Sequence, residues 1–129
     1  MKIEHIAIWT TDLERLRAFY QTYFKAEAGQ KYTNAAKGFQ SYFLRFDLGA
    51  RLELMTRPSV TDVPADGDTE PIGYTHLAIS LGSESAVDAM TERLRLDGCQ
   101  VIDGPRRTGD GYYESVVLDP DGNRLELTV

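Results

Sequence analysis

The order of apolar and polar positions predicts a strand and then an amphipathic helix at the start of the chain. Residues 3–10 alternate and are rich in β-branched side chains, which is typical of a half-buried strand. Apolar residues then recur at helical spacing over 13–24, after Thr11 or Asp12 as the cap. We expect Gly29 to end this helical segment. Further strands are expected at Tyr32, 40–47 and 50–56.

The second half of the chain repeats the same order of patterns. A strand-like stretch over 74–81 precedes a helix that Ser83 or Ser85 can cap and that Gly98 ends. Three more strands are expected at 99–102, 112–118 and 124–129. Each half therefore reads as a βαβββ module.

Two short motifs show that the halves are copies of one unit. His-Ile-Ala-Ile at 5–8 recurs as His-Leu-Ala-Ile at 76–79, and Arg-Leu-Glu-Leu at 51–54 recurs at 124–127. Duplication of one supersecondary unit explains both recurrences. The sequence thus predicts an α+β fold of two tandem βαβββ modules, with helices covering one face of each sheet. We expect one domain over 1–129, with module one at 1–57, a linker at 58–71 and module two at 72–129.

Composition and charge narrow the class of protein. A chain of 129 residues that is 42% hydrophobic is of the right size for one domain with its own core. The net charge of −6 argues against binding to nucleic acid, which needs clustered Lys and Arg. No apolar run approaches the ~20 residues that span a membrane, and the start lacks a signal-peptide pattern, so we expect a cytoplasmic protein. The single cysteine, Cys99, is expected to be a small buried residue.

The repeated motifs carry a candidate metal site. Alternation along the strands places His5, Glu53, His76 and Glu126 on the faces that the apolar residues leave uncovered. Both histidines of the chain hold equivalent positions in the repeat, and so do the two glutamates. Carboxylates in a concave site need a positive partner, which a divalent cation held by two imidazoles would provide. A salt bridge from the arginine two residues before each glutamate is the competing explanation.

The chain resembles the vicinal oxygen chelate superfamily, which contains glyoxalases, bleomycin-resistance proteins and ring-cleaving dioxygenases. The resemblance covers nearly the whole chain. It is most specific in the motif at 5–8, in Gly-Tyr-Thr-His-Leu-Ala-Ile at 73–79 and in Asp-Pro-Asp-Gly-Asn-Arg-Leu-Glu-Leu at 119–127. The last run, with Gly-Pro-Arg-Arg at 104–107 and Gly-Tyr-Tyr-Glu at 111–114, is typical of small bacterial glyoxalase I-like proteins.

The resemblance implies both a fold and a ligand set. In this family two βαβββ modules make curved mixed sheets that form a half-barrel around a divalent metal. His5, Glu53, His76 and Glu126 fall where bacterial glyoxalase I has its four ligands. The set suits Ni, Co, Zn, Mn or Fe better than Ca. The resemblance also implies a homodimer that shares the site between subunits, with Glu126 as the catalytic base; a site within one chain is the alternative.

The resemblance also sets expectations for the substrate. The implied activity is a lactoylglutathione lyase-type isomerisation of a small α-oxo or thiohemiacetal substrate. Trp9 and Arg57 differ from the family's glutathione-binding residues, so the thiol is left open. The aromatic residues and Arg57 are expected to line a cavity for a small molecule. This set is Trp9, Phe39, Tyr42, Arg57 and Tyr113.

Two other functions remain open at this stage. A non-catalytic binder, such as an antibiotic-resistance protein of this fold, needs an aromatic-lined cavity and no metal. An Fe(II) ring-cleaving dioxygenase would use two histidines and one carboxylate. The second carboxylate, and the lack of a spare histidine for acid–base work, favour the lyase.

Overall fold

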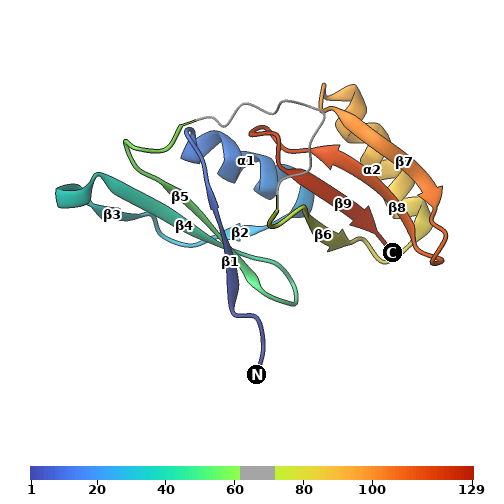
Figure 1. Ribbon diagram of the computed structural model, residues 1–129, viewed down its shortest axis with the longest axis horizontal. Helices are drawn as coiled ribbons and strands as arrows, with labels where there is room; N and C mark the ends of the chain where they lie inside the picture. Colours follow the sequence, from blue (N-terminus) through green and yellow to red (C-terminus); the bar gives the residue numbers. More distant parts are fainter. Residues whose placement is uncertain (62–71) are drawn as a thin grey trace. The chain divides into compact units, whose positions relative to one another are not determined.

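The computed structural model describes residues 1–61 and 72–129 (Figure 1). The chain divides into two compact units, one from each half of the sequence. The division falls in the predicted linker 58–71, of which 62–71 lie outside the described residues. Each unit has its own mixed sheet and follows the βαβββ order, with one additional short strand in module one, which confirms the predicted α+β class.

Module one builds its sheet in the strand order β1-β5-β4-β2, and β3 pairs with β4. Strands β1 and β5 are parallel, whereas β4 is antiparallel to β5, β2 and β3. A short 3₁₀ turn, Ala35–Lys37, separates β3 from β4. The elements in chain order are β1 (His5–Trp9), α1 (Leu13–Phe24), β2 (Glu27–Ala28), β3 (Tyr32–Asn34), β4 (Phe39–Arg45) and β5 (Arg51–Thr56).

Module two repeats this arrangement with one strand fewer. Its sheet has the order β6-β9-β8-β7, with β6 parallel to β9 and the other neighbours antiparallel. The elements are β6 (His76–Ser80), α2 (Glu84–Leu96), β7 (Val101–Arg107), β8 (Tyr113–Leu118) and β9 (Arg124–Thr128). Strand β7 runs five residues beyond the predicted 99–102, through irregular pairing with β8 around Gly104.

Local sequence signals set the helix ends, with one correction. The side chain of Asp12 accepts a hydrogen bond from Arg15 N and caps α1, and Ser83 caps α2 in the same way through Ala86 N. Gly98 follows α2 with a positive φ, as expected. The prediction that Gly29 ends the first helix was wrong. Lys25 takes the left-handed conformation at φ 53° and ends α1 there.

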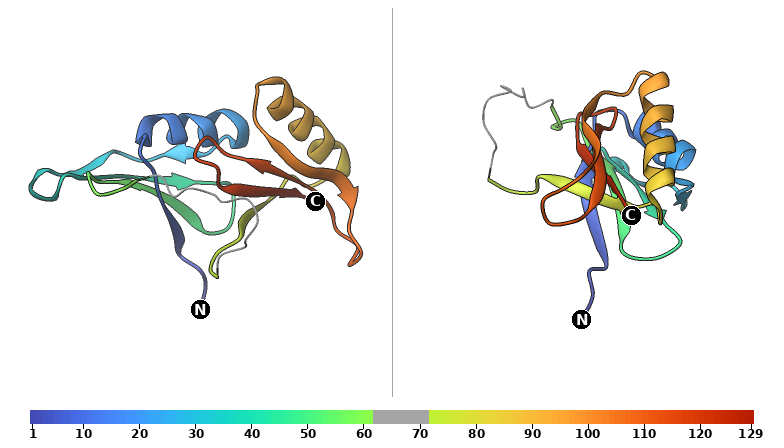
Figure 2. Two further views of the ribbon diagram at one scale, coloured as in Figure 1. Left: turned by 45° about the horizontal axis from the view of Figure 1, so that its top comes forward. Right: turned by 90° about the vertical axis from the view of Figure 1, so that its right-hand side faces the viewer.

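The helix of each module covers one face of its own sheet (Figure 2). Helix α1 packs on β4 and β5, and α2 packs on β7, β8 and β9. The leucines that flank Glu53 and Glu126 lie on these covered faces and are at most 2% exposed. Because strand side chains alternate, both glutamates must point to the opposite, uncovered face. Neither helix among the described residues is long and apolar enough to cross a membrane.

Candidate metal centre

Module one brings His5 and Glu53 together on its uncovered face. The parallel register places Ala7 beside Glu53, so His5 lies one step diagonally from the carboxylate on the same face. His5 Nε2 lies 3.8 Å from Glu53 Oε2. The other ring nitrogen, Nδ1, bonds to the carboxylate of Glu4. A carboxylate on the second nitrogen fixes the orientation of an imidazole, which is a common arrangement around metal-binding histidines.

Module two reproduces this geometry with His76 and Glu126. Its parallel register places Ala78 beside Glu126, the counterpart of Ala7 beside Glu53. His76 Nε2 lies 3.4 Å from Glu126 Oε2. The two motifs found in the sequence therefore build two equivalent His–Glu pairs, one in each module.

The competing salt bridge is not what module one forms. Arg51 pairs with the carboxylate of Glu4 and places its guanidinium 4.1 Å from the centre of the Phe43 ring. The ion-pair partner of Glu53 is His5. Arg51 and Glu53 thus have separate partners, and the Glu53 carboxylate stays directed toward the imidazole.

The chemistry and spacing of each pair fit two ligands of one divalent ion. Ligands about 2.0–2.1 Å from a metal lie roughly 2.9–3.4 Å apart in octahedral or tetrahedral geometry. The separation of the His Nε2 and Glu Oε2 atoms lies within this range in module two. In module one it is slightly longer, and a small side-chain movement would bring the two atoms into the range. The glutamate side chains are only 15% and 19% exposed. Within residues 1–61 and 72–129, no cluster of three or more His, Cys, Asp or Glu is close enough to hold a metal, so each pair supplies half of the expected ligand set.

Three of the five residues expected in the substrate cavity lie together on the uncovered face of module one. The Trp9 and Phe39 rings meet edge to face with centroids 6.2 Å apart. The guanidinium carbon of Arg57 lies 4.8 Å from the centre of the Trp9 ring. Because Trp9 is on the same strand and the same face as His5, this group lies on the face that carries the His–Glu pair.

The two tyrosines of that set lie on the helix-covered faces instead. Tyr42 pairs with Leu54 across the sheet, is buried and donates a hydrogen bond to Glu14 of α1 at 3.1 Å. Tyr113 lies on the same face of β8 as the buried Ser115, and its hydroxyl donates a hydrogen bond to Asp88 of α2 at 2.7 Å. The structure therefore separates each tyrosine from the His–Glu pair of its own module by the thickness of a sheet.

Sequence reasoning missed two residues on the uncovered faces, Phe43 and Glu114. Phe43 is the cross-strand partner of Glu53, and its ring meets the His5 ring edge to face at 5.3 Å. Glu114 lies on the face of Glu126, one diagonal step along β8. Desolvation, with the negative charge of Glu126 adding to it, raises the pKa of the Glu114 carboxyl above its usual value. Once the strand pairing is known, Phe43 is found directly opposite Glu53, and Glu114 is found two residues before the strand partner of Glu126.

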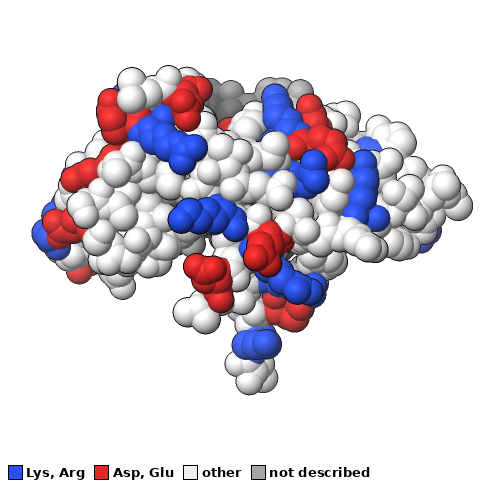
Figure 3. Space-filling model, turned by 180° about the vertical axis from the view of Figure 1, so that it is seen from behind, with Lys and Arg blue, Asp and Glu red and all other residues white. Residues whose placement is uncertain are grey.

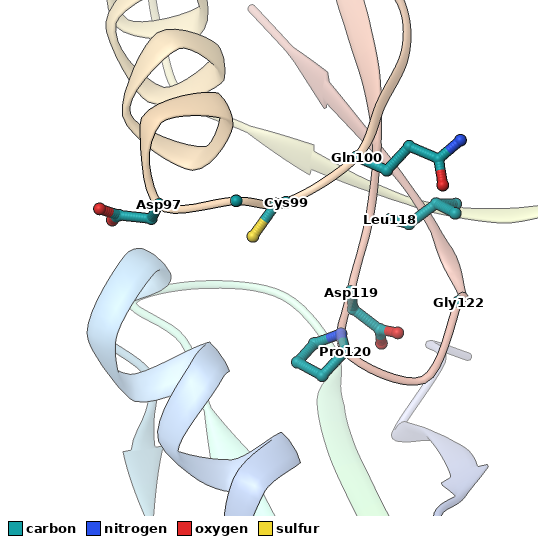
Figure 4. A pocket seen from close by; sticks show the side chains of 8 residues that line it. Asp97, Cys99, Gln100, Leu118, Asp119, Pro120 and Gly122 are labelled. Atoms are coloured by element: carbon teal, nitrogen blue, oxygen red, sulfur yellow. The ribbon is translucent and has the colours of Figure 1, made fainter.

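A pocket of about 370 Å³ lies in module two between the end of α2 and the β8–β9 turn (Figure 4). Cys99 is half-buried there, and burial, with the charge of Asp97, raises the pKa of its thiol. A thiol with a raised pKa is a poor nucleophile at neutral pH. The pocket lining includes neither His76 nor Glu126, so we place the candidate centre elsewhere in this module.

Surface charge follows no single sign. On the face drawn in Figure 3, Lys and Arg side chains are interspersed with Asp and Glu. Ion pairs such as those of Arg107 with Glu84 and of Arg95 with Glu92 place the two signs side by side.

Comparison with known proteins agrees with the architecture. The chain is 28% identical over 128 residues to the uncharacterized protein YqjT of Bacillus subtilis (strain 168), covering 97% of this chain and 96% of YqjT. A glyoxalase family protein from Enterococcus faecalis has a similar structure, with a TM-score of 0.78 and 25% identity over 99% of this chain and 97% of that one. Glyoxalase I from Zea mays matches with a TM-score of 0.76 and 22% identity over 98% of this chain, which spans only 44% of the maize chain. The model of the Glyoxalase/Bleomycin resistance protein/Dioxygenase superfamily matches residues 2–127, and the chain belongs to that superfamily.

Proposed function

We propose that the protein is a metal-dependent isomerase of the glyoxalase I type, acting on a small substrate with oxygens on adjacent carbons. The observation that carries this proposal is the pair of equivalent His–Glu sites, at 3.8 Å and 3.4 Å, on uncovered sheet faces. Two imidazoles and two carboxylates suit borderline ions such as Ni, Co, Zn, Mn or Fe. A protein that only binds a ligand would not need a second carboxylate that can accept a proton, whereas an isomerase does.

A complete ligand set requires that the two pairs share one ion. We propose a homodimer in which His5 and Glu53 of one protomer meet the partner's His76 and the partner's Glu126. Strands β1 and β6, which carry the histidines, lie at the ends of their sheets and leave unpaired edges within each module. Association of two chains is a usual way to cover such edges.

In this proposal Glu126 is the general base. A bound divalent ion would supply Lewis-acid stabilisation of negative charge on the two substrate oxygens. Glu126 takes the proton from the hydroxyl-bearing carbon, the electron pair of that C–H bond becomes a carbon–carbon double bond, and the carbonyl π pair moves onto the neighbouring oxygen to give an enediol anion. The carboxyl then returns the proton to the neighbouring carbon while the hydroxyl proton passes from the first oxygen to the second, which leaves Glu126 ionised and the substrate isomerised. Glu114, whose pKa is raised by desolvation and by the charge of Glu126, lies on the same sheet face as Glu126.

The test separates proton transfer from metal binding. Metal-loaded protein is assayed with hemithioacetals of methylglyoxal formed from several thiols, including glutathione. A general base contributes about 10²–10⁴-fold in rate. Glu126→Gln should therefore lose most of the activity while keeping much of its metal, whereas Glu53→Gln should lose metal. Glu92→Gln, on the exposed surface of α2, is the matched control and should change neither property. Full activity in Glu126→Gln would refute its role as the base.

Mixing two inactive variants tests the sharing of the site. With a shared site, a heterodimer of His5→Ala and His76→Ala chains has one site with both lesions and one with neither. Part of the activity should then return after subunit exchange. Proven exchange without any recovery would show that each site lies within a single chain.

The exposed aromatic rings around Trp9 favour one second candidate, a non-catalytic binder of small molecules. A binder of this kind would hold its ligand equally well after removal of metal by a chelator. The ring-cleaving dioxygenase gains no support from a particular contact, and oxygen uptake with a catechol distinguishes it from the isomerase.

A further inference from the structure

A contiguous aromatic surface lies on the uncovered face of module one, beginning four residues along β1 from His5. The Tyr32 and Phe39 rings have centroids 6.0 Å apart, and Phe39 contacts Trp9 edge to face. These three rings come from β3, β4 and β1 (Figure 1). Trp9 is 42% exposed and Tyr32 55% exposed, so the surface is open to solvent. We call Tyr32, Phe39, Trp9 and Arg57 the aromatic patch.

The patch carries one cation that is not neutralised by the described residues. Arg57 follows directly after β5 and lies over the Trp9 ring at 4.8 Å. Within residues 1–61 and 72–129, no carboxylate lies within salt-bridge distance of its guanidinium, and Glu53 is paired with His5. A guanidinium held over an indole is oriented by the ring and keeps its donors for an anion.

The internal repeat shows that the fold does not require this patch. Ser80 of β6 occupies the position that Trp9 occupies in β1, since both lie four residues after the motif histidine. The two modules share the His–Glu pair and the buried leucines, which maintain the site and the core. The exposed indole and its stacked arginine occur in module one alone. Exposed aromatic surface that packing does not need is characteristic of a binding site.

We propose that the aromatic patch binds a flat, unsaturated ligand that carries a carboxylate, and that this ligand group is the non-reacting part of the substrate. The planar fork of Arg57 matches a carboxylate with two parallel hydrogen bonds. The exposed Trp9 and Tyr32 side chains favour an aromatic or conjugated group over a branched aliphatic one, because ring–ring contacts add to simple burial. The link to the reaction rests on the proposed function, but binding at the patch does not.

Trp9 makes the experiment specific to this surface, because it is the only tryptophan of the chain. Its indole N–H gives a single side-chain resonance in a ¹⁵N–¹H correlation spectrum. Chelator-treated protein is titrated with trans-cinnamate, with the neutral cinnamyl alcohol and with the saturated cyclohexanecarboxylate. Since metal is absent throughout, failure of the metal chemistry leaves this result unaffected.

We expect a saturable shift of the Trp9 resonance with cinnamate, and weaker binding of both analogues. Arg57→Gln should weaken cinnamate binding about tenfold, as loss of a charge-assisted hydrogen-bond pair predicts, and leave the binding of the alcohol unchanged. Arg45→Gln, at the exposed end of β4 in the same sheet, is the control and should bind like the wild type. Equal affinities for the three probes, an unchanged affinity in Arg57→Gln, or no saturable shift at millimolar cinnamate would each overturn the proposal.

Discussion

The hydroxyl pair between α2 and β8 should couple the helix to the strand that holds the Glu126 face in place. Thr91 and Ser115 are at most 1% exposed, and their hydroxyl oxygens lie 2.6 Å apart. Thr91 Oγ1 also donates to the carbonyl of Val87 at 2.7 Å. Each hydroxyl has one proton, so Ser115 must be the donor to Thr91. Ser115 is the cross-strand partner of Leu127, the neighbour of Glu126.

These contacts set the expected magnitudes. Thr91→Val leaves the Ser115 hydroxyl buried without its acceptor, which costs about 1–3 kcal/mol. Ser115→Ala leaves Thr91 bonded to Val87 and costs about 0.5–1.5 kcal/mol. The double variant removes both polar groups, so we expect its total loss of stability to be about 1 kcal/mol smaller than the sum of the two single losses.

Urea unfolding followed by circular dichroism measures the four free energies. Protein concentration is held constant because association stabilises the folded state. Independent sites deviate from additivity by only roughly 0.3–0.5 kcal/mol. If the loss in the double variant equals the sum of the single losses within that margin, the assigned donor and acceptor roles are refuted.

Two further predictions concern backbone and charge. A Cβ at Gly104, where φ is +75°, would lie 2.5 Å from the carbonyl oxygen of Glu114. Gly104→Ala should therefore destabilise the protein by more than about 1 kcal/mol. Gly109→Ala is the control, since its Cβ would meet open space, and it should change the thermal midpoint little. The hydrogen bond from Lys31, and to a smaller extent the one from Tyr42, lowers the pKa of the Glu14 carboxyl below its ordinary value of 4.5. The ionised carboxylate therefore stabilises the fold fully above pH 4.5, and this stabilisation is lost as the pH falls through the lowered pKa. Glu14→Gln should therefore lower stability by up to about 1 kcal/mol at neutral pH, and thermal scans should show the difference closing in acid; a difference that persists there would contradict this assignment.

Strand alternation and the repeat were sufficient to place the two histidines and the two glutamates on the uncovered sheet faces. Each histidine and glutamate holds a fixed place in a short motif, and the parity of that place decides the face. The buried leucines on either side of each glutamate leave only one orientation. The module order and both helix caps followed from equally local signals.

The residues expected in the cavity could not be predicted as well, because the faces on which they lie depend on pairing between strands. Phe39 and Tyr42 are three residues apart in β4, so they point to opposite faces, and only the register with β5 shows which one accompanies Glu53. Chemical type suggested Tyr113, whereas the register places its neighbour Glu114 on the site face. The end of α1 at Lys25 also had no sequence signal, since a left-handed lysine is uncommon.

Metal stoichiometry tests the shared centre most directly. Protein stripped with a chelator is titrated with Co(II), whose visible absorption reports ligand geometry, and bound metal is counted by mass spectrometry. If the pairs at His5–Glu53 and His76–Glu126 share one ion, the wild type binds one Co(II) per chain with micromolar or tighter affinity, and Ala in place of either histidine greatly weakens that binding. Two ions per chain, binding that survives the loss of one pair, or no binding in the micromolar range would contradict the shared site.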